Sequence, residues 1–177
     1  NVLYKQTTFI VNILTIPFCI LMIFFADVFL KLYNFSTEEI LLYKPFLIIL
    51  IIARMIYLLA GNSGAFMTMA GIEKKELLIQ TIRGTLSILL ALIFIEEYKL
   101  VAVVILIIFS MIFVAIAQLI YIKKEINISP FSSDLFLLIF LSIPIVFFAV
   151  NYQITFSFYH YILIPIIVYL FYFVVFY

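Results

Sequence analysis

The amino-acid sequence predicts an all-α fold, a polytopic bundle of about six transmembrane helices. The chain is 68% hydrophobic and 11% charged, and its mean hydropathy is +1.37. Soluble domains are about 45–50% apolar and about 25% charged. The apolar runs reach the length of about 20 residues that a helix needs to cross a bilayer. They do not alternate with polar residues, as the strands of a membrane β-barrel would.

Six apolar segments follow one another along the chain. We expect spans at about 9–30, 43–70, 77–95, 100–122, 134–150 and 159–177. The polar joints between them are short, and none is long enough for a soluble domain. We therefore expect residues 1–177 to form a single transmembrane domain. Because the chain starts with Asn1 and shows no signal pattern, we expect it to be the C-terminal portion of a longer protein.

Basic residues divide unequally between the two sides of the expected bundle. One set of helix ends carries Lys5, Lys74, Lys75, Arg83, Lys123 and Lys124, and the other carries Lys31, Lys44 and Lys99. Cytoplasmic loops carry the excess of Lys and Arg, so we place the first set and both chain ends in the cytoplasm. The net charge of +1 comes without a basic patch, and we expect no nucleic-acid partner.

The four glycines of the chain lie in one stretch, GNSGAFMTMAGIEKKELLIQTIRG at 61–84. Small residues let membrane helices approach closely, so we expect Gly61, Gly64 and Gly84 at helix–helix contacts. Gly71 stands directly before a charged turn. We expect it to end the second span in the left-handed conformation that glycine adopts readily.

Arg54 is the charge that lies deepest in a predicted span. It follows Lys44 by ten residues and precedes Gly71 by seventeen. A charge at the centre of a span costs about 2.5 kcal/mol or more on insertion scales, and it normally faces a bundle interior, a watery cavity or a carboxylate. We expect Arg54 to line a solute pathway. The alternatives are a structural ion pair, with Asp27 as the candidate partner, and a side chain that extends to the interface.

A second polar face lies on the third predicted span. Gln80, Gly84, Ser87 and Ala91 share one face of an α-helix, with Arg83 at its margin. Arg83 lies one turn into the span and could instead reach cytoplasmic headgroups. Gln80, Asn62 and Gln118 could be satisfied by contacts between helices. All of these residues remain candidates for a polar cavity.

No reactive set accompanies these polar residues. Cys19 is the one cysteine, so it forms no intramolecular disulfide, and we expect it to be buried. His160 is the one histidine; it makes no metal site alone, and we expect it at an external interface. The nine acidic residues lie in predicted joints or near helix ends. We therefore expect no enzymatic activity, no cofactor and no metal.

Two stretches of the chain resemble a known family. TIPFCILMIFFADVFLKLY is similar to a family span that starts with Pro and closes with "fa-d-il-ly". GNSGAFMTMAGIEKKELLIQTIRGTLSILLALIFI is similar to the family's span, G-x-x-K turn and next span. The family is the polysaccharide flippases, Wzx-type O-antigen and capsule exporters of the multidrug/oligosaccharidyl-lipid/polysaccharide (MOP) superfamily. The resemblance covers roughly residues 5–122. Lys99 and Val101 depart from it, because the family often has glycines there.

The resemblance implies a MOP/MATE-like C-terminal bundle, part of a longer multi-pass transporter in the cytoplasmic (inner) membrane. Such proteins flip an undecaprenyl-diphosphate-linked oligosaccharide, a repeat unit of O-antigen lipopolysaccharide, capsule or exopolysaccharide, with an ion gradient driving the cycle. The partners would be that lipid-linked substrate, membrane lipid and a coupling ion.

The same resemblance suggests roles for the polar residues already singled out. It makes Arg54, Arg83, Gln80 and Asn62 candidates for substrate contact, and Asp27 a candidate for ion coupling. The sequence leaves three other functions open. They are a MATE-like drug or cation exporter, a membrane enzyme of lipid-linked sugar assembly, and a non-catalytic assembly subunit.

Overall fold

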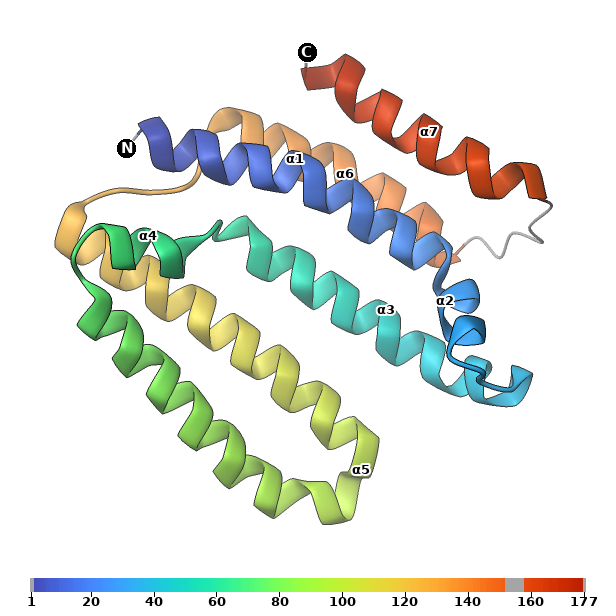
Figure 1. Cartoon of the computed structure of the whole chain (residues 1–177), viewed down its shortest axis with the longest axis horizontal. Helices are drawn as coiled ribbons and strands as arrows, with labels where there is room; N and C mark the ends of the chain where they lie inside the picture. Colours follow the sequence, from blue (N-terminus) through green and yellow to red (C-terminus); the bar gives the residue numbers. More distant parts are fainter. Residues whose placement is uncertain (1, 152–157, 177) are drawn as a thin grey trace.

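The computed structural model describes residues 2–151 and 158–176, and every regular element among them is an α-helix (Figure 1). The helices are α1 (Val2–Phe24), α2 (Ala26–Leu32), α3 (Thr37–Leu59), α4 (Ser63–Met69), α5 (Glu73–Ile126), α6 (Ser133–Asn151) and α7 (Phe158–Phe176). The predicted all-α helical bundle is confirmed.

α1 lies at the centre of the bundle. It packs against α2, α3, α6 and α7, whereas α5 packs against α3 and α4. Figure 1 shows α3 between two parts of the molecule, with α1, α6 and α7 on one side and the long α5 on the other. α5 is therefore joined to the rest of the chain through α3 and α4.

Three apolar clusters hold these helices together. The first joins α1, α6 and α7 around Ile20 and Leu138. The second joins α1, α3 and α6 around Ile23 and Ile51. The third joins α1, α4 and α5 around Met67. Between helices in lipid, close packing replaces the hydrophobic effect as the main attraction, so the fit of these side chains decides stability.

α5 consists of two helical arms joined at a reversal of direction at one residue. Lys99 has φ 45° and ψ −120° within the 54 residues of the helix, and Figure 1 shows α5 folded into a hairpin. Its two arms correspond to the predicted spans 77–95 and 100–122, but the joint is narrower than the predicted EEYK segment. Lys99 takes the backbone conformation that glycine adopts at the first central position of a type II′ turn.

Lys99→Gly is expected to stabilise the protein by about 1 kcal/mol, because glycine adopts a positive φ without the strain that a Cβ causes. Thermal unfolding of the purified protein in detergent would measure the gain. Glu97→Gly is the matched control: it places glycine in helical backbone two residues earlier and should cost about 0.5–1 kcal/mol. A loss of stability in both variants would contradict the strained conformation of Lys99.

Two predicted spans are divided by short breaks. The first, expected at 9–30, is split at Phe25 between α1 and α2, and α1 already begins at Val2. The second, expected at 43–70, begins earlier, at Thr37, because Ser36 and Glu39 form a capping box. It then breaks after Leu59. Hydropathy predicts the apolar length of a span, but it does not detect caps or single-residue breaks.

Among the described residues, four helical segments are long and apolar enough to cross a membrane, judged by length and composition. They are Val2–Phe24, Thr37–Met69 taken together, Glu73–Ile126 and Ser133–Asn151, with Leu163–Phe176 a shorter apolar helix. Because Glu73–Ile126 doubles back at Lys99, it supplies two antiparallel arms. The joint predicted between the last two spans lies largely outside the described residues.

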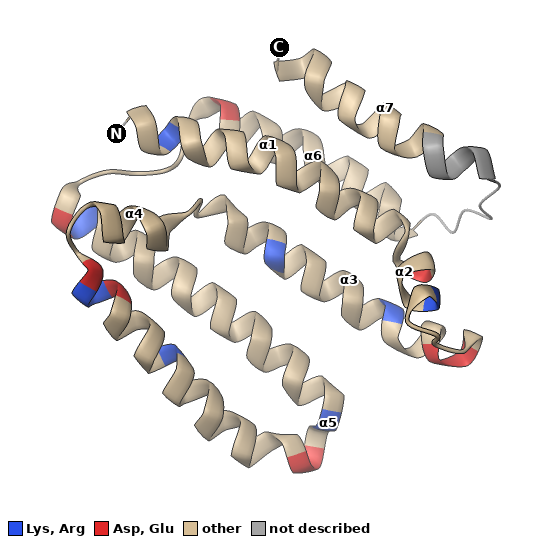
Figure 2. Cartoon of the chain, in the orientation of Figure 1, with Lys and Arg blue, Asp and Glu red and all other residues tan. Residues whose placement is uncertain are grey.

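Most charged residues gather at the ends of the helices, while α3 and the first arm of α5 each carry one basic residue along their length (Figure 2). Tyr4, Ile79 and Ile122 share one apolar cluster, which places the start of α1 beside both ends of α5, where Lys5, Lys74, Lys75, Lys123 and Lys124 lie. The opposite end holds α2 and the start of α3. This division agrees with the two sets of basic residues in the sequence. That the first set faces the cytoplasm stays a prediction.

Candidate functional site

Arg54 and Arg83 line one cavity of about 420 Å³ between α3 and the two arms of α5. Ser87 and Ser110 add hydroxyl groups from opposite arms, and most of the remaining wall is apolar. Pockets of about 300–1,000 Å³ with mainly apolar walls and a few polar groups are typical of small-molecule sites. The cavity is therefore the candidate functional site.

Helix geometry positions each polar group of this cavity. Arg54 and Tyr57 are three residues apart on α3 and face the same side, and the guanidinium carbon lies 5.0 Å from the centroid of the Tyr57 ring. This cation–π contact orients the arginine. Arg83 and Ser87 are four residues apart on α5 and, with Ala91, line the same cavity. The polar face predicted on the third span is confirmed for these residues.

Neither arginine is paired with a carboxylate in the described part of the chain. The ion pair found there joins Lys44 Nζ to Asp27 Oδ2 at 2.8 Å. The predicted alternative that Asp27 pairs with Arg54 is therefore wrong, because Asp27 lies at the end of the bundle beside the start of α3. Solvent or a ligand must therefore compensate the positive charges of Arg54 and Arg83 in the cavity.

Asp27 itself lies outside the cavity. It stands in the first turn of α2, and its ion pair with Lys44 is partly exposed. Exposed ion pairs are worth only about 0–1 kcal/mol. The structure thus gives Asp27 a local partner, and its suggested part in ion coupling stays a prediction.

Gln80 and Asn62 are not brought to the arginine cavity. Gln80 Nε2 donates to Glu76 Oε1 at 2.6 Å, and Gln118 Nε2 donates to Glu76 Oε1 and Oε2 at 3.0 and 2.8 Å. Asn62 is exposed between α3 and α4. It occupies the N-cap position of α4, but its side chain makes no capping hydrogen bond. The side chains of Gln80 and Gln118 therefore have a structural role, as hydrogen-bond donors to Glu76 within the bundle.

The glycines fulfil three of their four predicted roles. A Cβ at Gly61 would lie 2.3 Å from Thr8 Oγ1, and one at Gly64 would lie 2.9 Å from Glu76 Oε1, so both permit close packing. Gly71 has φ +76° and ends α4, as predicted. The packing role predicted for Gly84 is wrong, because a Cβ there would meet no described atom within 4 Å.

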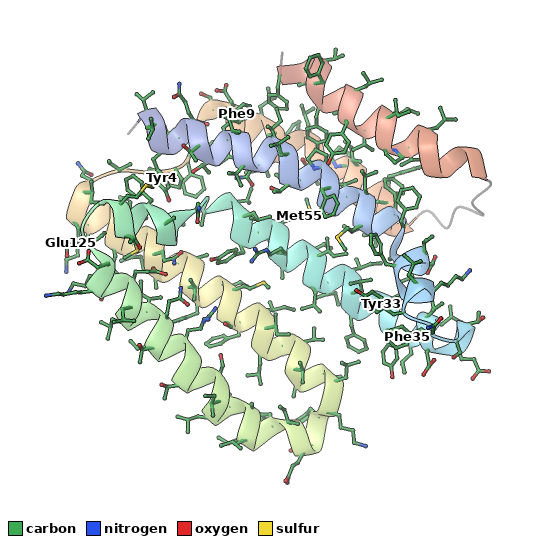
Figure 3. The ribbon with its side chains drawn as sticks, viewed as in Figure 1. Tyr4, Phe9, Tyr33, Phe35, Met55 and Glu125 are labelled. Atoms are coloured by element: carbon green, nitrogen blue, oxygen red, sulfur yellow. The ribbon has the colours of Figure 1, made fainter. Side chains whose placement is uncertain are left out.

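Three buried residues of α1 were not predicted as site residues. Tyr4, Thr8 and Asn12 follow one another at intervals of four on a single helix face. Tyr4 Oη donates to the Ala60 carbonyl at 2.9 Å, and Asn12 Nδ2 donates to the Leu58 carbonyl at 2.9 Å. Figure 3 shows Tyr4 at the start of α1, next to α4. The sequence signal was present: polar side chains at i, i+4 and i+8 in an apolar helix.

The remaining reactive residues form no centre. Cys19 is a free, buried cysteine, as predicted. Within the described ranges, no group of three or more His, Cys, Asp or Glu side chains is placed to hold a metal. The His160 side chain lies outside the part of the chain whose side chains the structure describes.

The long apolar helices and the cationic cavity between them define a helical membrane protein. Comparisons with protein-family models, with curated proteins and with solved structures find no match. What the cavity binds must therefore be argued from its own chemistry.

Proposed function

We propose that the chain belongs to a membrane transporter that moves an anionic, diphosphate-linked lipid oligosaccharide across the cytoplasmic membrane. The observation that carries the proposal is the cavity between α3 and α5, in which Arg54 and Arg83 stand among apolar side chains. The resemblance of two stretches of the sequence to polysaccharide flippases supports the same substrate class.

The charge of the cavity favours phosphate as the ligand. Arginine presents a planar fork of N–H donors that matches phosphate oxygens two at a time, and such charge-assisted hydrogen bonds are the strong ones. Placing arginine in a membrane is costly unless a partner or water compensates it. In the described residues no carboxylate pairs with Arg54 or Arg83, so a phosphate group would supply the missing negative charge.

The walls of the cavity suit an amphiphilic substrate. Ser87 and Ser110 offer hydroxyls for sugar or phosphate oxygens, and Leu106, Ile107 and Met111 offer apolar contact. A cation exporter of the MATE-like kind would need a carboxylate in this position, where the described lining is arginine. The cavity thus favours an anion over a cation as the transported species.

Replacing both arginines, Arg54→Gln with Arg83→Gln, in the native gene is expected to lower glycan export at least about tenfold. Such a factor corresponds to losing about 1.4 kcal/mol of substrate binding, less than charged hydrogen bonds commonly contribute. Surface glycan would fall and its lipid-linked precursor would accumulate inside the cell. Both quantities are measured at matched protein level in the membrane.

Lys31→Gln is the matched control, because Lys31 is an exposed cation on α2 away from the cavity. It should leave export unchanged. Arg54→Lys should export less than the native protein and more than Arg54→Gln, since lysine keeps the charge and loses the fork. Normal export in the double arginine variant, at normal protein level, would overturn the proposal.

A further inference from the structure

The break between α3 and α4 opens the backbone inside the apolar bundle. α3 ends at Leu59, Gly61 has φ +69°, and α4 begins at Ser63. The last carbonyl groups of a helix lack partners within it, and they form the negative end of the helix dipole. The negative end of α3 therefore lies at the break, against the buried face of α1.

Two carbonyl groups near the break have partners. The Leu58 carbonyl accepts hydrogen bonds from the Gly61 amide at 2.8 Å and from Asn12 Nδ2 at 2.9 Å. The Ala60 carbonyl accepts from Tyr4 Oη at 2.9 Å and from the Ser63 hydroxyl. The break is thus held open by specific bonds from α1 and α4.

Two side-chain oxygens at the same place have no partner. Thr8 Oγ1 and Asn12 Oδ1 make no hydrogen bond, although Thr8 is 1% exposed and Asn12 is 0% exposed. The orientation of the Asn12 amide is fixed, because Nδ2 faces the carbonyl oxygens of Thr8 and Leu58. Thr8 Oγ1 faces the break, 2.3 Å from the position that a Cβ of Gly61 would occupy. Buried polar atoms are satisfied in nearly all proteins, so these two oxygens require a partner that the described residues do not supply, a water or an ion.

We infer that Thr8 Oγ1 and Asn12 Oδ1, beside the carbonyl end of α3, form a binding site for a monovalent cation such as Na⁺. Small hard cations prefer oxygen ligands. Broken membrane helices offer such ligands, because their unwound carbonyls and negative half-helix ends face the ion. The side chains that meet at this break are all neutral: Tyr4, Thr8, Asn12 and Ser63. A set of neutral ligands suits a singly charged ion, whereas divalent ions are bound mainly by carboxylate ligands.

The site binds weakly and stands apart from the arginine cavity. Affinity for a hard cation rises with the number of charged ligands, and this site has none, so binding is on the order of millimolar. Arg54 lies one helical turn before Leu58 on α3 and adds repulsion. Neither Thr8 nor Asn12 lines the cavity, so the cation site does not depend on the proposed transport function.

The test uses the purified full chain in lipid nanodiscs. Its unfolding temperature is followed as NaCl replaces choline chloride at constant ionic strength. A bound ion stabilises the folded state in a saturable manner, while general salt effects are equal in both salts. Na⁺ is expected to raise the unfolding temperature above that in choline. A second measurement, binding of radioactive sodium to the native protein, requires no variant.

Thr8→Val removes the hydroxyl and keeps the shape of the side chain. It is expected to raise the Na⁺ concentration for half-maximal stabilisation at least about tenfold, since even supporting residues of ion sites change affinity by about 10–100-fold. Thr8→Ser, which keeps the oxygen, should respond like the native protein. Thr7→Val is the matched control, because the Thr7 hydroxyl is exposed and bonds to the Leu3 carbonyl of its own helix.

Two results would overturn the inference. One is an unfolding temperature that is equal in Na⁺ and choline, with no binding of radioactive sodium. The other is a native Na⁺ response in Thr8→Val, which would mean that water, not an ion, satisfies the two oxygens. Neither result bears on glycan export, so failure here is distinguishable from failure of the proposed function.

Discussion

Gly61→Ala is expected to destabilise the protein by about 2–4 kcal/mol, through strain in the backbone and a clash with α1. The backbone at Gly61 has φ +69°, where an added Cβ costs about 1–2 kcal/mol. That Cβ would also lie 2.3 Å from Thr8 Oγ1 and 2.9 Å from Thr8 Cγ2. Thr8 is buried on α1, so the whole helix must shift. Forcing a methyl group into a packed interior commonly costs about 1–3 kcal/mol.

Unfolding of the purified protein by heat or by a denaturing detergent measures this loss. Gly84→Ala is the matched control, because Gly84 is helical and a Cβ there meets no described atom within 4 Å. Alanine at that site should stabilise the helix by about 0.5–1 kcal/mol. Opposite signs for the two substitutions are therefore expected. A Gly61→Ala protein as stable as the native one would contradict the close approach of α1 to the break.

Gln118→Leu is expected to cost about 1–3 kcal/mol, because it leaves the partly buried Glu76 carboxylate short of hydrogen bonds. Gln118 is 2% exposed, and its amide donates to both carboxylate oxygens of Glu76. Only the Gln80 amide, at 2.6 Å, would remain as a side-chain donor to Glu76 among the described residues. These bonds join the beginning of α5 to its second arm, so their loss weakens the hairpin at its open end.

The same unfolding measurement tests this cost. Gln6→Leu is the control: Gln6 is exposed on α1, and its replacement should change stability by less than about 0.5 kcal/mol. Adding Glu76→Met to Gln118→Leu removes the stranded charge and should restore much of the stability, since replacing both partners by apolar groups is nearly neutral. Equal effects of Gln6→Leu and Gln118→Leu would refute the role of the Glu76 contact.

Apolar length was the feature of the fold that the sequence predicted best. α6, Ser133–Asn151, matches the expected span 134–150 closely, because it is an apolar run bounded by polar residues, with Ser142 as the one polar residue inside it. The breaks at Phe25 and Gly61 were not predicted. Each is a change of backbone angle at one or two residues, and a window of apolar side chains averages over it.

The sequence predicted which residues line the candidate site better than it predicted how those residues are arranged in space. A deep arginine on an apolar helix indicates a cavity because its charge needs compensation, and Arg54 does line one. Helical periodicity places Arg83 and Ser87 on one face of their own helix. It does not specify which other helix they face, because this depends on how α3 crosses the two arms of α5. Gln80 instead bonds to Glu76, four residues earlier on its own helix, a pairing that periodicity permits but that was not predicted.

The single-residue reversal at Lys99 has a consequence for how the protein enters the membrane during its synthesis. The tip of α5 carries Glu96, Glu97 and Lys99. In the predicted orientation, with both ends of α5 in the cytoplasm, these charges must pass through the bilayer core. Carrying each of these charges across the bilayer costs about 2.5–3.5 kcal/mol. The insertion of both apolar arms together offsets this cost, because the arms are strongly apolar: α5 contains an 18-residue stretch of mean hydropathy 3.3. α5 therefore enters as one closed hairpin with local contacts that form early. The cavity is completed only when that hairpin closes against α3, so Arg54 and Arg83 come together in a late step of assembly.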